Sequence, residues 1–229
     1  MNDRPGYLDV LAQRALIFDG AMGTSIQGYD LSAEDFGGKE GCYDYLSLTR
    51  PDVIEEIQSA YCAVGVDVLE TNSFQASRLK LGEYGLQEHT VAINRAAAQI
   101  ARRVADRHET PKHPIWVAGS MGPTGMLPSS EDPTLGRITY DEIADLYGEQ
   151  GQALIEGGVD LLVIETQQDI LETKAAIAGL VRMFKRTGLK VPIQAQVSLD
   201  TTGRMLLGTD VAAVLTTLQA LPIQVVGLN

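Results

Sequence analysis

Two acidic residues, Asp19 and Glu165, each follow a short, mostly apolar run. Asp19 follows "ALIF" at 15–18, and Glu165 follows "DLLVI" at 160–164. If both runs are strands of one parallel sheet, the two carboxylates stand at the same edge of that sheet. Two carboxylates in one cavity repel each other, and a cation between them relieves the repulsion. The pair therefore predicts a binding site for a positively charged group.

A glycine-containing turn, "DGAMGT", begins at Asp19 itself. Glycines let a ligand approach the backbone closely, and backbone N–H groups in such a turn can surround an anion. The turn lacks both the G-x-G-x-x-G spacing and the lysine of a phosphate-binding loop. An anion in this turn beside an ammonium group between Asp19 and Glu165 describes an α-amino acid, which we predict as the ligand. The candidate residues in the turn are Gly20, Ala21, Met22, Gly23 and Thr24.

Two further polar segments follow predicted strands, "ETNSF" at 70–74 and "GSMGPTG" at 119–125. Polar side chains at these positions are candidates for hydrogen bonds to the ligand, although closing a strand-to-helix turn is an equally good role for them. The candidates are Asn72, Ser73 and Ser120.

Other roles stay open for the acids and for the next segment. An acid after a strand often only caps the next helix, and a pair of acids can hold Mg²⁺. The segment "MLPSSEDPTLGR" at 126–137 is rich in Pro and Ser and is expected to form a long loop at the same edge, where it could act as a lid.

The elements that position these residues are short apolar strands and longer helices. Runs rich in Val and Ile, apolar on both faces, are typical of parallel strands covered by helices. The strands are predicted at 15–18, 66–70, 115–119, 160–165, 193–197 and 223–228. Helices are predicted at 51–64 with Thr49 as the cap, 88–107, 139–156 with a Thr139–Glu142 capping box, 169–186 and 209–220.

Strands that alternate with helices indicate a parallel α/β sheet with right-handed crossovers. An open doubly wound sheet and a (β/α)8 TIM-type barrel both fit this order. Polar residues close every predicted strand, and a barrel gathers all its strand ends at one rim, where its active site lies. We therefore expect residues 1–229 to form one barrel domain that reaches only to about the sixth strand.

Composition narrows the classes of partner. The formal net charge is −12, which argues against binding nucleic acid or an anionic membrane surface. The two cysteines, Cys42 and Cys62, form no CxxC pair; they exclude a disulfide framework and favour a reducing compartment. With no hydrophobic signal region and no apolar run long enough for a bilayer, a cytoplasmic protein is expected.

An ordered set of motifs extends over about residues 15–229. The motifs are "DGAMGT", "LTRPDVI", "ETNSFQASRLKLGEYGL", "GSMGPTG", "GGVDLLVIET", "DILETKAA", "GTD" and "VVGLN". Together they resemble the homocysteine-binding barrel of the homocysteine S-methyltransferase family. "GSMGPTG" and "TTGRMLLGTD" are more similar to the cobalamin-dependent methionine synthases than to the branches that use betaine or S-methylmethionine as the methyl donor.

The resemblance implies a function for the predicted pocket. Asp19 and Glu165 match the family's acids that hold the homocysteine amino group, and the turn around Ala21 to Thr24 matches the segment that receives the carboxylate. In the family a zinc ion held by three cysteines binds the thiol. The methyl group passes from methyltetrahydrofolate to cobalamin and then to homocysteine, with folate and cobalamin bound by other domains.

The family's zinc cysteines follow strands six and eight, and the first of them comes directly after the position of Asn229. We therefore expect no zinc at this site, negligible methyltransferase activity from this chain alone, and exposed sheet edges that promote aggregation. A non-catalytic amino-acid-binding module remains an alternative. A magnesium-dependent aldolase or isomerase barrel predicts a catalytic lysine at a strand end, and the sequence has none there.

Overall fold

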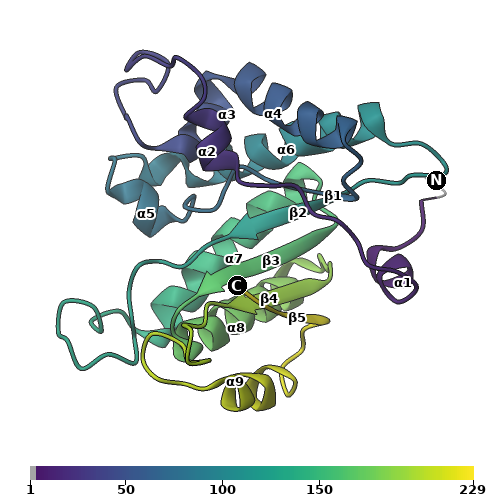
Figure 1. Ribbon diagram of the computed structural model, residues 1–229. Coiled ribbons are helices and arrows are strands. Elements are labelled where there is room, and N and C mark those ends of the chain that lie inside the picture. Colours follow the sequence, from purple (N-terminus) through teal and green to yellow (C-terminus); the bar gives the residue numbers. More distant parts are fainter. Residues whose placement is uncertain (1–3) are drawn as a thin grey trace.

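The computed structural model describes residues 4–229, whose strands form one parallel sheet (Figure 1). Its strands pair in chain order, β1-β2-β3-β4-β5. They are β1 (Val68–Glu70), β2 (Trp116–Met121), β3 (Leu161–Gln167), β4 (Ile193–Val197) and β5 (Val225–Leu228). Parallel strands added in chain order through helical crossovers are the arrangement of a (β/α) barrel, and they confirm the predicted α/β class.

The predicted first strand, 15–18, is not a regular strand. It reaches the sheet through a single parallel bridge between Phe18 and Val68. Backbone bonds are few here: the N–H groups of Asp67 and Val68 donate to the Ile17 carbonyl, and the Asp19 N–H donates to the Val68 carbonyl. A side chain adds to them, because the Ile17 N–H donates to Asp67 Oδ2 across 2.9 Å and the Arg14 guanidinium pairs with the same carboxylate. Because the Ile17 N–H bonds a side chain, the backbone ladder stays too short for a regular strand, and the sheet has five strands where six were expected.

All five predicted helices are present, with ends shifted by a few residues. They are α4 (Pro51–Ala63), α6 (Thr90–His108), α7 (Tyr140–Gly157), α8 (Ile170–Thr187) and α9 (Val211–Leu218). The capping box of Thr139 and Glu142 opens α7 as predicted. The predicted cap of α4 is wrong: Arg50 holds that position, because Thr49 ends the preceding helix and its hydroxyl donates to the Tyr45 carbonyl.

Short helical segments account for much of the remaining chain. None of them was predicted, because each has too few residues to show a hydrophobic period. They are α1 (Tyr7–Leu11), α2 (Met22–Ile26), α3 (Leu46–Thr49), α5 (Arg78–Gly82) and the 3₁₀ turns η1 (Tyr43–Tyr45) and η2 (Gln87–His89).

The two faces of the sheet are covered by different parts of the chain. The outer face packs against the long helices; Figure 1 shows α4 and α6 beside the β1 end of the sheet, and α8 and α9 beside the β5 end. The inner face packs against α1, where the Tyr7 ring meets Trp116 edge to face at 6.1 Å. Successive residues of a strand point to opposite faces. The inner-face apolar residues are Val68, Trp116, Ala118, Leu161 and Val163.

Helices α7 and α8 approach each other closely at Gly179. A Cβ atom placed there would lie 1.9 Å from the Ala144 carbonyl oxygen, so the contact requires glycine. Such a contact fixes the spacing of the layer behind β3 and β4. Across residues 4–229, none of the helices is both long enough and apolar enough to span a bilayer.

Candidate functional site

Side chains alternate between the two faces of the sheet along each strand. This alternation places three polar side chains on the inner face, at one end of the sheet. On β1, β2 and β3, the residue two positions after an inward-facing apolar residue is polar. These residues are Glu70, Ser120 and Glu165. The pairing of Glu70 with Ala118, and of Ser120 with Val163, sets the three strand ends side by side.

A cavity of about 540 Å³ lies at this end of the sheet. Every candidate residue from the sequence lines it except Thr24, which is exposed on α2. The candidates that line it are Asp19, Gly20, Ala21, Met22, Gly23, Asn72, Ser73, Ser120 and Glu165. Residues outside the candidate set also line it, namely Gly41, Tyr43, Asp44, Glu70, Thr71, Phe74 and Gln75.

Asp19 is fixed by the end of β1. Both of its carboxylate oxygens accept the backbone N–H of Glu70 at 3.1 Å. Burial raises the pKa of Asp19 to about 7; its backbone hydrogen bonds oppose this rise, and the charge of Glu165 adds to it. A carboxyl group with this pKa is poised to ionise when a cation enters.

Glu165 is fixed by the end of β2. The Ser120 hydroxyl donates to Glu165 Oε1 across 2.6 Å. Burial raises the pKa of Glu165, and this hydrogen bond opposes the rise. The pairing of β3 with β4 shifts register between Ile164 and Gln167, and Thr166 has a φ of 58°. A β-branched residue rarely adopts this conformation, and such a bulge redirects neighbouring side chains.

Glu70 is the functional-looking residue that the candidate set omitted. It lines the cavity, and burial together with the charges of Glu165 and Asp19 raises its pKa. The sequence pattern that could have identified Glu70 is its position two residues after Val68, because residues i and i+2 of a strand point to the same face.

Asn72 and Ser73 are tied into the surrounding structure. Asn72 Nδ2 donates to the Tyr43 carbonyl across 2.8 Å, and the Ser73 hydroxyl donates to the Ser120 carbonyl across 2.8 Å. Ser73 is fully buried. Both contacts join segments far apart in the sequence, so these side chains hold the cavity wall together instead of closing a local turn.

The glycine turn is partly helical. Residues Met22–Ile26 form α2, with Ala21 at the N-cap position. The backbone at Gly20 lies close to the Tyr61 side chain: a Cβ atom there would lie 2.7 Å from the Tyr61 hydroxyl. Within residues 4–229, the backbone N–H groups of 20–24 donate to no protein acceptor. Those of 20–23, which line the cavity, remain available to a ligand there.

The cavity is lined by acids without a balancing base. Asp19, Asp44, Glu70 and Glu165 line it, and among the described residues no Lys, Arg or His does. Asp44 is buried, accepts the Gln75 N–H at 2.9 Å, and has its pKa raised by burial to about 6. A cavity with this lining favours a ligand that brings positive charge.

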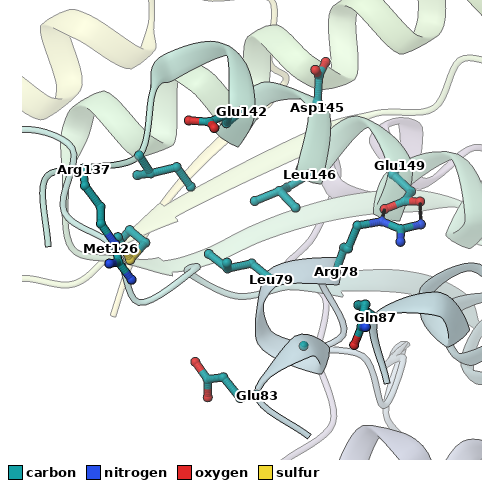
Figure 2. Close-up of a pocket in the computed structure, with 12 residues that line it drawn as sticks. Arg78, Leu79, Glu83, Gln87, Met126, Arg137, Glu142, Asp145, Leu146 and Glu149 are labelled. Carbon is teal, nitrogen blue, oxygen red and sulfur yellow. Dashed lines mark hydrogen bonds and ion pairs between the residues drawn. The ribbon is translucent and has the colours of Figure 1, made fainter. Parts of the chain in front are cut away.

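A larger cavity of about 1060 Å³ lies elsewhere, between α5, α7 and the loop before α7 (Figure 2). None of the candidate residues lines it. Arg78 on its wall already pairs with Glu149 at 2.6 Å, and apolar side chains such as Leu79 and Leu146 fill much of the rest. Because the acids at the strand ends converge on the smaller cavity, we place the candidate site there.

The predicted lid, 126–137, is a loop without regular structure. It is tied to α8 at Ser129, whose N–H and hydroxyl both donate to Asp169 at 2.7 Å. Its residues Met126 and Arg137 line the larger cavity, and none of its residues lines the smaller one. The loop therefore borders a different cavity from the one it was expected to cover.

The described residues hold no group of three or more His, Cys, Asp or Glu side chains arranged for a metal ion. Cys42 is buried in a small apolar cluster, and Cys62 packs partly buried on α4. Burial raises the pKa of both thiols to about 11, which disfavours the thiolate form that binds metals.

Sequence relatives agree on one family. A family model described as "Homocysteine S-methyltransferase" matches residues 16–229. The methionine synthase of Mycobacterium tuberculosis (strain ATCC 25618 / H37Rv) is 43% identical over 222 residues, which cover 97% of this chain and 18% of that protein. The methionine synthase of Mycobacterium leprae (strain TN) is 41% identical over the same shares. The chain thus spans about 18% of the length of the curated relatives it matches.

Solved structures share the fold. The metallated form of the homocysteine methyltransferase MmuM from Escherichia coli superposes with a TM-score of 0.77 at 21% identity, covering 96% of this chain and 76% of that one. The oxidized form gives the same TM-score and covers 97% and 76%. From the match of the family model over residues 16–229, this chain belongs to the homocysteine S-methyltransferase family.

Proposed function

We propose that this chain binds homocysteine and presents its thiol for methylation, as the homocysteine-binding part of a methionine synthase. The observation that supports this most directly is the convergence of Asp19 and Glu165 on one cavity whose lining includes no cationic side chain among the described residues. A substrate ammonium group supplies the missing charge.

The α-amino group is proposed to lie between the Asp19 and Glu165 carboxylates. Each charge-assisted hydrogen bond contributes about 1.5–3 kcal/mol when shielded from water. The Glu70 N–H and the Ser120 hydroxyl hold the two acceptors in place before the ligand arrives. Because the acceptors are already fixed, little ordering is left to oppose binding.

The α-carboxylate is proposed to meet the backbone N–H groups of 20–24. Residues 20–23 line the same cavity as Asp19, and Thr24 follows them on α2. An amino acid bound by both ends has its side chain directed by the two contacts, so the homocysteine sulfur takes a fixed position relative to the strand ends.

Zinc, when bound in this family, holds the thiol as the thiolate nucleophile. The described residues do not fit such an ion, since no suitable side-chain group is present and both cysteines lie in packed surroundings. We therefore assign to this chain only the binding and orientation of homocysteine. We place cobalamin, as the methyl carrier, and folate on other domains of a longer protein.

Calorimetric titration of the chain with homocysteine and with 4-mercaptobutyrate tests the proposal. The second compound keeps the thiol and the carboxylate and lacks only the amino group. We expect homocysteine to bind at least about tenfold more tightly, since two charge-assisted hydrogen bonds are lost with the amine. Equal affinity for the two compounds would contradict the proposed role of the acids.

A further inference from the structure

The cavity contains one more carboxyl group at the sheet end than a single ammonium needs. The Asp19 carboxylate accepts the Glu70 N–H, and the Glu165 carboxylate accepts the Ser120 hydroxyl. A hydrogen bond donated to a carboxylate favours its ionised form. The Glu70 carboxyl accepts no such bond from residues 4–229; the donor that reaches Glu70, Gln58 Nε2, binds its main-chain carbonyl at 2.9 Å.

The charged groups that face Glu70 across the cavity are all acidic, and the other titratable residue of the lining is Tyr43. Asp19 comes from the segment before α2, Glu165 from β3 and Asp44 from η1, and no basic side chain of the described chain lines the cavity with them. Burial and the charges of Glu165 and Asp19 raise the pKa of Glu70. When like charges crowd one site, the proton settles on the group with the fewest stabilising contacts, which here is Glu70.

We propose that Glu70 serves in this cavity as a neutral carboxylic acid, which leaves Asp19 and Glu165 as the two carboxylates at the sheet end that one ammonium group requires. Asp44, the remaining acid of the lining, lies on η1 and already accepts the Gln75 N–H. The inference rests on the proposed function and adds a specificity-determining residue to it. Three ionised acids at the sheet end would favour a divalent cation or a diamine. Two acids match the single ammonium of an amino acid, and the Glu70 O–H adds a donor suited to an anionic part of the same ligand.

The protonation of Glu70 can be measured without any ligand. Glutamate labelled with ¹³C at the side-chain carboxyl gives one NMR signal per residue, and the signal that disappears in Glu70→Gln identifies Glu70. We expect that signal in the wild-type chain to titrate with a midpoint above pH 7. A midpoint below pH 6 would show an ionised Glu70 and overturn the inference.

Binding measurements at pH 7 then test its role. Glutamine resembles a neutral acid in shape, and Glu70→Gln keeps the backbone N–H that holds Asp19. We expect Glu70→Gln to bind homocysteine within about threefold of wild type, whereas the matched change Glu165→Gln weakens binding at least about tenfold. Equal losses in the two variants would overturn the inference.

Two further outcomes separate the hypotheses. A wild-type chain that holds a protonated Glu70 but does not bind homocysteine would contradict the proposed function while supporting the assignment of the proton. Titration with 1,4-diaminobutane tests the charge count: we expect it to bind more weakly than homocysteine, and tighter binding of the diamine would overturn the selectivity.

Discussion

The Ser120 hydroxyl donates to Glu165 Oε1 across 2.6 Å and joins the ends of β2 and β3 at the candidate cavity. This bond opposes the rise in the pKa of Glu165 that burial causes. Ser120 therefore favours the ionised form of one of the two proposed ammonium acceptors, without needing to contact the ligand itself.

Replacing Ser120 with alanine tests that relationship. We expect Ser120→Ala to raise the pKa of Glu165 further and to weaken homocysteine binding at pH 7 by about three- to tenfold, the equivalent of one lost hydrogen bond. Ser129→Ala is the matched control. The Ser129 hydroxyl donates to Asp169 across 2.7 Å, and neither residue lines the candidate cavity. A control that weakens binding as much as Ser120→Ala would contradict the assigned role.

Removing the charge of Glu165 is expected to have a larger effect. Glu165→Gln keeps the size of the side chain but loses its charge-assisted bond, so we expect the homocysteine Kd to rise by about 10- to 150-fold, or 1.5–3 kcal/mol. Glu149→Gln, which removes a charge at the other cavity, serves as the control and should leave Kd unchanged. Calorimetry on both variants decides the point, and an unaltered Kd in Glu165→Gln rules out the amino-group contact.

The raised pKa of Asp19, about 7 in the folded chain, predicts how stability depends on pH. Between about pH 4 and pH 7 the folded state binds more protons than the unfolded state, whose Asp titrates near 3.9, so the free energy of unfolding falls as pH rises. At about 1.36 kcal/mol per unit of pKa, this one group accounts for a few kcal/mol.

Urea denaturation at pH 4.5 and pH 7.5 measures that dependence. The decline should be smaller in Asp19→Asn than in wild type. Some decline should persist in the variant, because the pKa values of Asp44 and Glu70 are raised as well. An identical decline in both proteins would show that Asp19 is not the group responsible.

The contact between α7 and α8 predicts a stability effect far from the cavity. Gly179→Ala places a methyl group against the Ala144 carbonyl, and we expect the free energy of unfolding to drop by about 1–3 kcal/mol as the helices move apart. Gly82→Ala is the control: it ends α5 and its new Cβ would lie 3.9 Å from its nearest neighbour, Gln87. Comparable losses in the two variants would mean that the close approach is not what requires glycine at 179.

Much of this architecture was predictable from local patterns. Apolar runs located the five strands of the sheet, and the capping box of Thr139 and Glu142 located the start of α7 within a residue. Because parallel strands share one carboxyl edge, the residues that end them could be expected to meet, and Asp19 and Glu165 do line one cavity.

What escaped prediction depends on contacts between distant segments. The backbone before Asp19 looks like a strand, yet it makes only one bridge to β1, and the Ile17 N–H donates to the Asp67 side chain. Helix α1 covers the inner face, and its Tyr7 hydroxyl donates to Gln194 Oε1 across 3.0 Å. The two residues are 187 positions apart in the sequence. Treating β1 as apolar on both faces also hid the alternation that directs Glu70 into the cavity.

The structure of the chain crystallised with homocysteine tests the central claim most directly. The account predicts the amino nitrogen within about 2.7–3.2 Å of carboxylate oxygens from both Asp19 and Glu165, with the α-carboxylate toward the backbone of 20–24. Homocysteine seated in the larger cavity beside Arg78, or bound with its amino group turned away from both acids, would contradict it.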